Sequence, residues 1–254
     1  MTTTKPNSVK RSENGNEEPF PYRDYVAVKT HLEAALKNGP WYGLVTGPSG
    51  TGKTSLFRDL SDVLAEARFH FVYVSSPKTS LQGLTRLLAK TFHVTPRRSY
   101  DETVSILAEA IRAHNSQLVL WLDEANDLPL DTLAQIRTLT ECDGASKPIC
   151  SLILAGLPQV RSVMDGHQFF PLKRRIVALK LSGLARDEVE PFLGYRFADQ
   201  KSSWLMTEHL DEIFERAQGA PALIDRVIRL LLKRPLKGMK PETLLREVLD
   251  EIGI

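Results

Sequence analysis

Hydrophobic residues follow two patterns along this chain, and the change between them divides the sequence into two regions. Up to about residue 182, short continuous apolar runs alternate with segments whose apolar residues recur every three or four positions. Continuous runs are typical of strands buried on both faces of a parallel sheet, and the longer spacing is typical of amphipathic helices. The alternation predicts an α/β fold with a parallel five-stranded sheet flanked by helices. The five predicted strands are Tyr42–Thr46, Phe69–Ser75, Leu118–Asp123, Ser151–Ala155 and Ile176–Leu181.

The predicted helices complete this division. Within the first region they are Tyr25–Leu36, Ser55–Ala65, Leu81–Phe92, Asp101–Ala113 and Asp131–Glu141. After Ser182 only helices are predicted, at Arg186–Phe197, Thr207–Ala217, Pro221–Lys233 and Pro241–Ile252. The first eighteen residues are mostly polar and too poor in apolar residues to pack. The sequence therefore predicts a disordered arm over 1–18, a nucleotide-binding core over 19–182 and a small helical lid over 183–254.

A glycine-rich loop follows the first predicted strand and precedes a predicted helix. The spacing of Gly, four residues, Gly, Lys and Thr lets backbone N–H groups converge on phosphates at a helix N-terminus. In such a loop Lys53 reaches the β- and γ-phosphates and the Thr54 hydroxyl binds Mg²⁺. The alternative is an accidental glycine-rich turn, against which the flanking strand and helix argue. The candidate nucleotide-binding residues are Gly47, Pro48, Ser49, Gly50, Thr51, Gly52, Lys53, Thr54 and Ser55.

Two acidic residues, Asp123 and Glu124, end the apolar run that begins at Leu118. Parallel sheets bind ligands at the carboxyl ends of their strands, so both acids are expected beside the phosphate loop. There Asp123 would hold Mg²⁺ through water, and Glu124 would orient the attacking water. A solvated strand end is the alternative. The order and spacing of the two motifs favour a nucleotide hydrolase.

Composition limits the classes of protein to consider. The net charge is only +2, so no whole-molecule field attracts nucleic acid and any basic surface must be local. Two cysteines, Cys142 and Cys150, match neither a disulfide framework nor a zinc pattern. No apolar stretch approaches the length of a membrane span, and residues 1–18 lack a signal-peptide core. We therefore expect a soluble, cytoplasmic protein without a membrane partner.

At these motifs the chain resembles AAA+ ATPases of the ExeA-like group, which includes the transposition regulators TnsC, TniB, MuB and IstB. The resemblance runs from about Tyr22 to Leu232 and is most specific where "DEANDLP" is followed by "AGLP" and then "RRI". It implies the P-loop AAA+ fold, ATP and Mg²⁺ as cofactors, and assembly of copies of the chain into a ring or a helical filament. It also implies an aromatic contact to adenine from Tyr22 or Tyr25, for which packing in the core is the alternative.

The resemblance further implies an arginine that reaches the γ-phosphate of a neighbouring subunit. Arg175 is the first candidate and Arg174 the second; a solvated basic loop or a DNA phosphate contact are the alternatives. Two positions depart from the family pattern, since Leu157 replaces a frequent Gln and Ala222 replaces the usual lid Arg. Arg226, one turn further along that helix, is the nearest basic candidate for the nucleotide. These departures predict slow hydrolysis, which suits a switch better than a motor.

By the same resemblance, we expect a regulator of DNA transposition that binds double-stranded DNA without sequence preference and works with a transposase and a target-selector protein. The candidate phosphate contacts are Lys78, Thr79, Arg97 and Arg98. The alternative is that Ser80 only caps a helix and the arginines form a solvated turn. Two other functions stay open: a secretion-associated ATPase like ExeA, and a nucleotide-gated scaffold with little hydrolysis.

Overall fold

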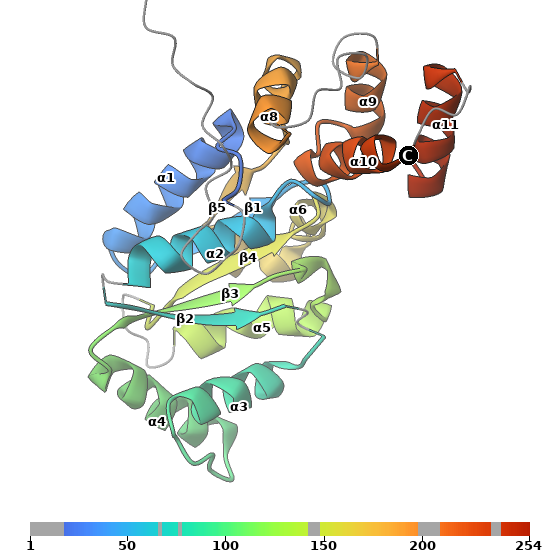
Figure 1. The fold of residues 1–254 in the computed structure, drawn as a ribbon. Helices are drawn as coiled ribbons and strands as arrows, with labels where there is room; N and C mark the ends of the chain where they lie inside the picture. Colours follow the sequence, from blue (N-terminus) through green and yellow to red (C-terminus); the bar gives the residue numbers. More distant parts are fainter. Residues whose placement is uncertain (1–17, 66–67, 76–77, 142–147, 198–208, 235–239) are drawn as a thin grey trace, which may run out of the picture. The chain divides into compact units, whose positions relative to one another are not determined.

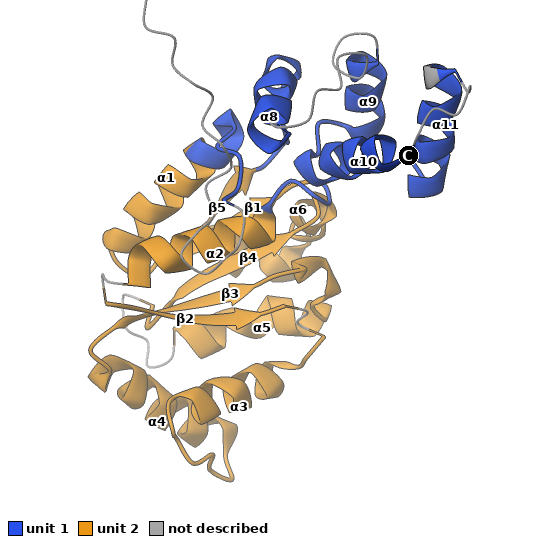
Figure 2. Cartoon of the chain, viewed as in Figure 1, with its two compact units in different colours: residues 1–26, 48–52, 181–254 blue, residues 27–47, 53–180 orange. Residues whose placement is uncertain are grey.

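The computed structural model describes residues 18–65, 68–75, 78–141, 148–197, 209–234 and 240–254. The chain forms two compact units, coloured separately in Figure 2. The sheet unit comprises residues 27–47 and 53–180, and the helical unit comprises residues 1–26, 48–52 and 181–254. The predicted arm, apart from Glu18, lies outside the described residues, as does Cys142.

The sheet unit is built on five parallel strands, which lie in the order β2-β3-β4-β1-β5 (Figure 1). Because every pairing is parallel, the carboxyl ends of all five strands lie along one edge. The first strand, β1, pairs on both sides, with Tyr42 opposite Leu152 on β4 and opposite Ile176 on β5. These observations confirm the predicted fold class. The strands are β1 (Tyr42–Thr46), β2 (Phe69–Val74), β3 (Gln117–Leu122), β4 (Ser151–Gly156) and β5 (Ile176–Lys180).

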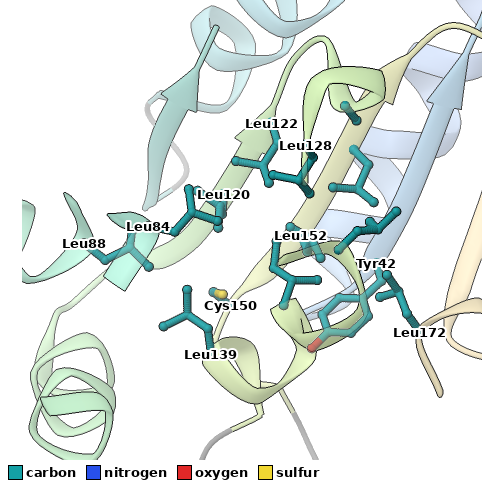
Figure 3. Packing of buried hydrophobic residues seen from close by; sticks show 14 of the residues in the cluster. Tyr42, Leu84, Leu88, Leu120, Leu122, Leu128, Leu139, Cys150, Leu152 and Leu172 are labelled. Atoms are coloured by element: carbon teal, nitrogen blue, oxygen red, sulfur yellow. The ribbon is translucent and has the colours of Figure 1, made fainter. Parts of the chain in front are cut away.

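Helices cover both faces of this sheet. On one face, Leu120, Leu122 and Leu152 pack into a large apolar cluster with α3, α4 and α5 (Figure 3). On the other face lies α2, whose Phe57 ring centroid is 5.4 Å from that of the fully buried Trp121. The helices of the sheet unit are α1 (Arg23–Lys37, from residue 27), α2 (Lys53–Leu64), α3 (Leu81–Thr91), α4 (Tyr100–Ala113), α5 (Leu130–Thr140), α6 (Gln159–Val163) and α7 (Phe170–Lys173), with 3-10 turns η2 (Ala125–Asp127) and η3 (His167–Phe169).

In the helical unit, the segment around Phe20 and Arg23 packs against residues that follow the last strand. The Phe20 and Phe192 rings meet edge to face with centroids 5.5 Å apart, and Arg23 forms ion pairs with Asp187 and Glu188. Within this unit α10 contacts both α9 and α11. Its elements are η4 (Arg186–Glu188), α8 (Val189–Arg196), α9 (Leu210–Ala217), α10 (Pro221–Lys233) and α11 (Pro241–Ile252).

The observed strands and long helices follow the predicted ones within one or two residues at most ends, and larger differences occur at η4 and at the short helices. The predicted helix Arg186–Phe197 begins instead as the 3-10 turn η4, where the Glu188 carboxylate accepts the Ala185 N–H at 2.9 Å. The short helices α6 and α7 were not predicted, because five and four residues are too few to show helical periodicity. The predicted start of α9, at Thr207, lies outside the described residues.

Candidate nucleotide site

The glycine-rich loop joins β1 to α2. Gly50 and Gly52 have φ angles of 81° and 92°, in the left-handed region that glycine adopts at little steric cost. Lys53 is the first residue of α2, so the loop leads directly into a helix N-terminus. Backbone N–H groups at such a terminus favour an anion, which is the local geometry expected for phosphate binding.

Lys53 is held inside the sheet unit. Its side chain is buried, and its ammonium donates a hydrogen bond to the Gly47 carbonyl at 2.9 Å. Burial lowers the pKa of Lys53, while the carboxylates of Glu124 and Asp123 act in the opposite direction. A buried cation beside a helix N-terminus is stabilised by an added anion, which is what a phosphate would supply.

Asp123 and Thr54 meet at the carboxyl edge of the sheet. The Thr54 hydroxyl donates to Asp123 Oδ2 at 2.7 Å, and the Glu124 N–H donates to Asp123 Oδ1 at 3.0 Å. Asp123 is buried, with 2% of its surface exposed. One hydroxyl beside one carboxylate suits Mg²⁺, which binds few protein groups and keeps several waters.

Tyr73, on β2, is a third partner of Asp123. Its hydroxyl donates to Oδ2 at 2.8 Å. Burial raises the pKa of Tyr73 to about 12, and the hydrogen bond with Asp123 adds to this effect, so the hydroxyl keeps its proton. The sequence pattern alone did not indicate a role for Tyr73. Tyr73 lies two residues before the end of a predicted strand. That position indicates a contact with Asp123 only when β2 is known to lie beside β3.

Glu124 has an unusual backbone conformation. Its φ and ψ are 51° and 46°, a left-handed conformation that is uncommon outside glycine. The side chain is exposed, and the Glu124 carbonyl accepts the Asp127 N–H at 2.8 Å as η2 begins. Strained residues that the surrounding fold holds in place cluster at functional sites, which fits the expected role of Glu124 beside the attacking water.

The end of β4 lies against both the phosphate loop and the segment after β3. The Gly47 N–H donates to the Gly156 carbonyl at 3.2 Å, and the Leu157 N–H donates to Asn126 Oδ1 at 3.4 Å. Leu157, the departure from the family pattern, therefore has a polar side chain next to its backbone. The Asn126 amide also donates to Asp127 at 3.1 Å, which fixes its orientation.

Comparison with known proteins places this site in a family. A family described as "AAA domain" matches residues 38–164, half of the 254-residue chain. The chain belongs to this AAA family. Its match covers both the glycine-rich loop and the acidic pair, so the nucleotide-binding core is that of an ATPase.

Among individual proteins, general secretion pathway protein A of Aeromonas hydrophila is 26% identical over 207 residues, which are 78% of this chain but 37% of that protein. The chain thus spans little more than a third of this curated relative. In structure it resembles Cdc6p of Pyrobaculum aerophilum (TM-score 0.62, 21% identity, covering 85% of this chain and 63% of that one). It also resembles Orc1 of Aeropyrum pernix, solved in complex with DNA (TM-score 0.64, 16% identity, 92% and 66%). These two likenesses support the AAA fold.

The middle of the AAA phosphate loop, residues 48–52, belongs to the helical unit. The Tyr22 hydroxyl donates to the Thr51 carbonyl at 2.6 Å, and the Ala222 N–H donates to the Gly50 carbonyl at 3.2 Å. Tyr22 and Tyr25 are both buried, which favours the packing alternative over an adenine contact. Ala222 thus contacts the loop through its backbone.

The remaining candidate nucleotide-binding residues make local contacts or are exposed. Thr51 donates its hydroxyl to the Pro48 carbonyl at 3.0 Å, Ser49 is exposed, and Ser55 is partly buried in the first turn of α2. Arg226 is exposed on α10.

The two candidate trans arginines precede β5. Arg175 pairs with Glu141 at the C-terminal end of α5, and Arg137 approaches the same carboxylate oxygen at 3.3 Å. The hydrogen bond to Glu141 raises the pKa of Arg175. β1 and β5 are parallel and in register, so Arg175 lies at the amino edge of the sheet, one strand length from the phosphate loop. Arg174 is exposed.

The candidate DNA contacts lie in two loops at opposite ends of α3. Lys78 precedes the helix and forms an ion pair with Asp127 at 3.4 Å. The adjacent Thr79 carbonyl accepts the Thr132 hydroxyl at 3.2 Å. Arg97 and Arg98 follow α3 and are exposed. An eleven-residue helix is about 16 Å long, and α3 separates the two loops by that length of helix along the chain. As the alternative expected, Ser80 caps α3 by accepting the Gly83 N–H at 3.2 Å.

Proposed function

We propose that this AAA chain is an ATP-dependent DNA-binding regulator of transposition. It assembles with copies of itself on duplex DNA without sequence preference, and it recruits or activates a transposase together with a target-selector protein. ATP and Mg²⁺ bind at the glycine-rich loop, with Thr54 and Asp123 towards the metal ion and Glu124 towards the attacking water. Hydrolysis acts as a switch on the assembly.

The ion pair between Lys78 and Asp127 is the observation that carries this proposal. Asp127 follows Glu124 by three residues, and the backbone of the two is joined by a 2.8 Å hydrogen bond. A DNA phosphate that binds Lys78 competes with Asp127 for the ammonium group. Binding of DNA therefore changes the charge next to the hydrolytic glutamate, which supports coupling between DNA binding and turnover.

The position of Arg175 supports assembly. Because it lies at the edge of the sheet away from its own phosphate loop, it can supply charge to a nucleotide only in another copy of the chain. A subunit that gives its arginine to the next and receives one from the previous makes a heterologous contact, which generates a ring or a filament.

The comparisons support the DNA partner at the level of the fold, since the similar Orc1 of Aeropyrum pernix was solved in complex with DNA. Transposition itself is proposed from the resemblance of "DEANDLP", "AGLP" and "RRI" to the transposition regulators. Among the described residues, no helix has the length and apolar character needed to span a membrane. We propose the cytoplasm as the location.

Two other functions have specific support. The 26% identity with general secretion pathway protein A favours a secretion-associated ATPase. Leu157 and Ala222, which replace polar groups of the family pattern, favour a nucleotide-gated scaffold with little hydrolysis.

Phosphate release measured with and without duplex DNA separates these functions. We expect DNA to change the rate for the wild type, and Lys78→Gln to abolish that response. Lys90→Gln, which removes an exposed charge from α3 outside the candidate contacts, is the matched control and should respond as the wild type does. A rate of phosphate release that is the same with and without DNA would contradict the proposal and favour the secretion-associated ATPase. Absence of phosphate release under all conditions would favour the scaffold.

A further inference from the structure

We propose that Tyr73 is a positioning residue of the Mg²⁺ site, where its hydroxyl fixes the Asp123 carboxylate in the orientation that faces Thr54. The inference deepens the proposed function, because it rests on the metal-binding role proposed for Asp123 and Thr54.

The strand pairing brings Tyr73 to the carboxylate. β2 lies beside β3 with Tyr73 opposite Trp121, and the Asp123 N–H continues the ladder by donating to the Val74 carbonyl at 2.9 Å. The Tyr73 hydroxyl then reaches Asp123 Oδ2 at 2.8 Å, the same oxygen that accepts the Thr54 hydroxyl at 2.7 Å. One carboxylate oxygen thus joins a hydroxyl from β2 and a hydroxyl from α2.

The Tyr73 ring is held in place by α2. It stacks on Phe57 with ring centroids 4.4 Å apart and an interplanar angle of 25°. Phe57 follows Thr54 by three residues, and its ring also lies 5.4 Å from Trp121, the neighbour of Leu122 on β3. The stack therefore fixes α2, which carries the Thr54 hydroxyl, relative to the end of β3, which Asp123 directly follows.

These contacts account for both carboxylate oxygens. Oδ1 accepts the Glu124 N–H at 3.0 Å, and Oδ2 accepts both hydroxyls. A terminal carboxylate torsion is otherwise broad, so an aspartate without these donors samples many orientations. Mg²⁺ demands near-ideal octahedral geometry and is sensitive to the direction of each oxygen. Tyr73 does not contact the nucleotide in this proposal; it acts through Asp123.

The test compares Tyr73→Phe, which keeps the ring and its stacking, with Tyr100→Phe. Tyr100 also has a buried hydroxyl, for which the described residues offer no hydrogen-bond partner, and it lies at the start of α4. Mn²⁺ is the probe, and its binding is measured by electron paramagnetic resonance in the presence of a non-hydrolysable ATP analogue. We expect Tyr73→Phe to weaken Mn²⁺ binding about tenfold, since it removes a hydrogen bond to a charged group. Tyr100→Phe should bind Mn²⁺ as the wild type does.

Two further measurements separate positioning from a general loss of structure. Affinity for the analogue in excess chelator should stay within experimental error of the wild type in Tyr73→Phe, and thermal unfolding should remain one cooperative transition whose midpoint is lower by only a few degrees. Addition of Mn²⁺ with the analogue should also change the near-ultraviolet tyrosine absorption of the wild type, and Tyr73→Phe should lose that change.

Asp123→Asn distinguishes failure of this inference from failure of the metal site. If Asp123→Asn weakens Mn²⁺ binding while Tyr73→Phe leaves it unchanged, the role of Tyr73 is overturned and the metal site stands. If Asp123→Asn also binds Mn²⁺ normally, both assignments are wrong. An equal loss of metal-free analogue affinity and of Mn²⁺ affinity in Tyr73→Phe would assign the residue to packing alone and overturn the inference.

Discussion

Arg175→Ala should abolish turnover in the assembled protein although Arg175 lies far from its own nucleotide loop. The residue precedes β5, and Glu141 holds its guanidinium at the amino edge of the sheet. The loop follows β1 at the opposite edge. Since β1 and β5 are in register over five residues, the start of β5, beside Arg175, and the end of β1, where the loop begins, are about 13 Å apart along the strand direction.

This separation sets the size of the expected effects. A unit charge about 13 Å away through a water-like dielectric changes a rate by less than about twofold. An arginine that contacts the transferred phosphate from a neighbouring subunit changes turnover by roughly 10³-fold or more. The rate loss expected in Arg175→Ala therefore differs by orders of magnitude between a distant charge in the same subunit and a phosphate contact from a neighbouring subunit. A steady-state phosphate-release assay distinguishes the two.

Mixing variants identifies the subunit on which Arg175 acts. Arg175→Ala and Glu124→Gln should each be inactive alone. In an equal, randomly mixed assembly, roughly one-quarter of the interfaces pair an intact Glu124 with an intact Arg175 from the next subunit. We therefore expect recovery of about one-quarter of the wild-type rate.

The doubly substituted chain, mixed with either single variant, is the control and should give no recovery. Arg174→Ala tests the neighbouring exposed arginine and should keep most of the activity. Absence of recovery in assemblies whose mixing is verified by light scattering, or a loss of only twofold in Arg175→Ala, would refute the assignment in trans.

Three further predictions concern the nucleotide-binding residues, the backbone of Glu124 and the candidate DNA contacts. Lys53→Ala should lose ATP binding whereas Glu124→Gln should keep it and lose turnover, because Lys53 contacts phosphate in the ground state and Glu124 acts on the water; equal loss of affinity in a nucleotide-binding titration would contradict these roles. In denaturant unfolding, the free energy of unfolding of Glu124→Gly should exceed that of Glu124→Ala by about 1 kcal/mol, because glycine adopts the left-handed backbone conformation without strain; equal free energies would show that residue 124 is unstrained. Replacing Lys78, Arg97 and Arg98 together by Ala should flatten the dependence of log DNA affinity on log salt, by about 0.9 per lost phosphate contact, and leave ATP binding intact; an unchanged slope would place the DNA contacts elsewhere.

The sequence was sufficient to predict the strands and most helices. The run Tyr42–Thr46 and the helices Pro221–Lys233 and Pro241–Ile252 have the predicted bounds, because long apolar patterns and flanking prolines fix them locally. The glycine spacing likewise predicted a backbone turn before a helix, and the observed left-handed angles of Gly50 and Gly52 agree with such a turn. Short elements such as α6 carry too few residues for such a pattern.

Contacts that depend on strand order could not be predicted in this way. Periodicity does not say that β2 lies beside β3, so the Tyr73 hydroxyl on Asp123 was missed. Nor does it say that the C-terminal end of α5 lies beside the start of β5, which is what pairs Glu141 with Arg175. Both contacts follow from the order β2-β3-β4-β1-β5, which is a property of the whole sheet.

Electron microscopy of the protein with duplex DNA tests the central claim, that ATP binding assembles this AAA chain on DNA. We expect ordered rings or filaments on duplexes of unrelated sequence when a non-hydrolysable ATP analogue and Mg²⁺ are present, and no such assemblies without nucleotide or with Lys53→Ala. Bare DNA beside dispersed protein at low salt, with nucleotide binding confirmed in the same sample, would contradict it.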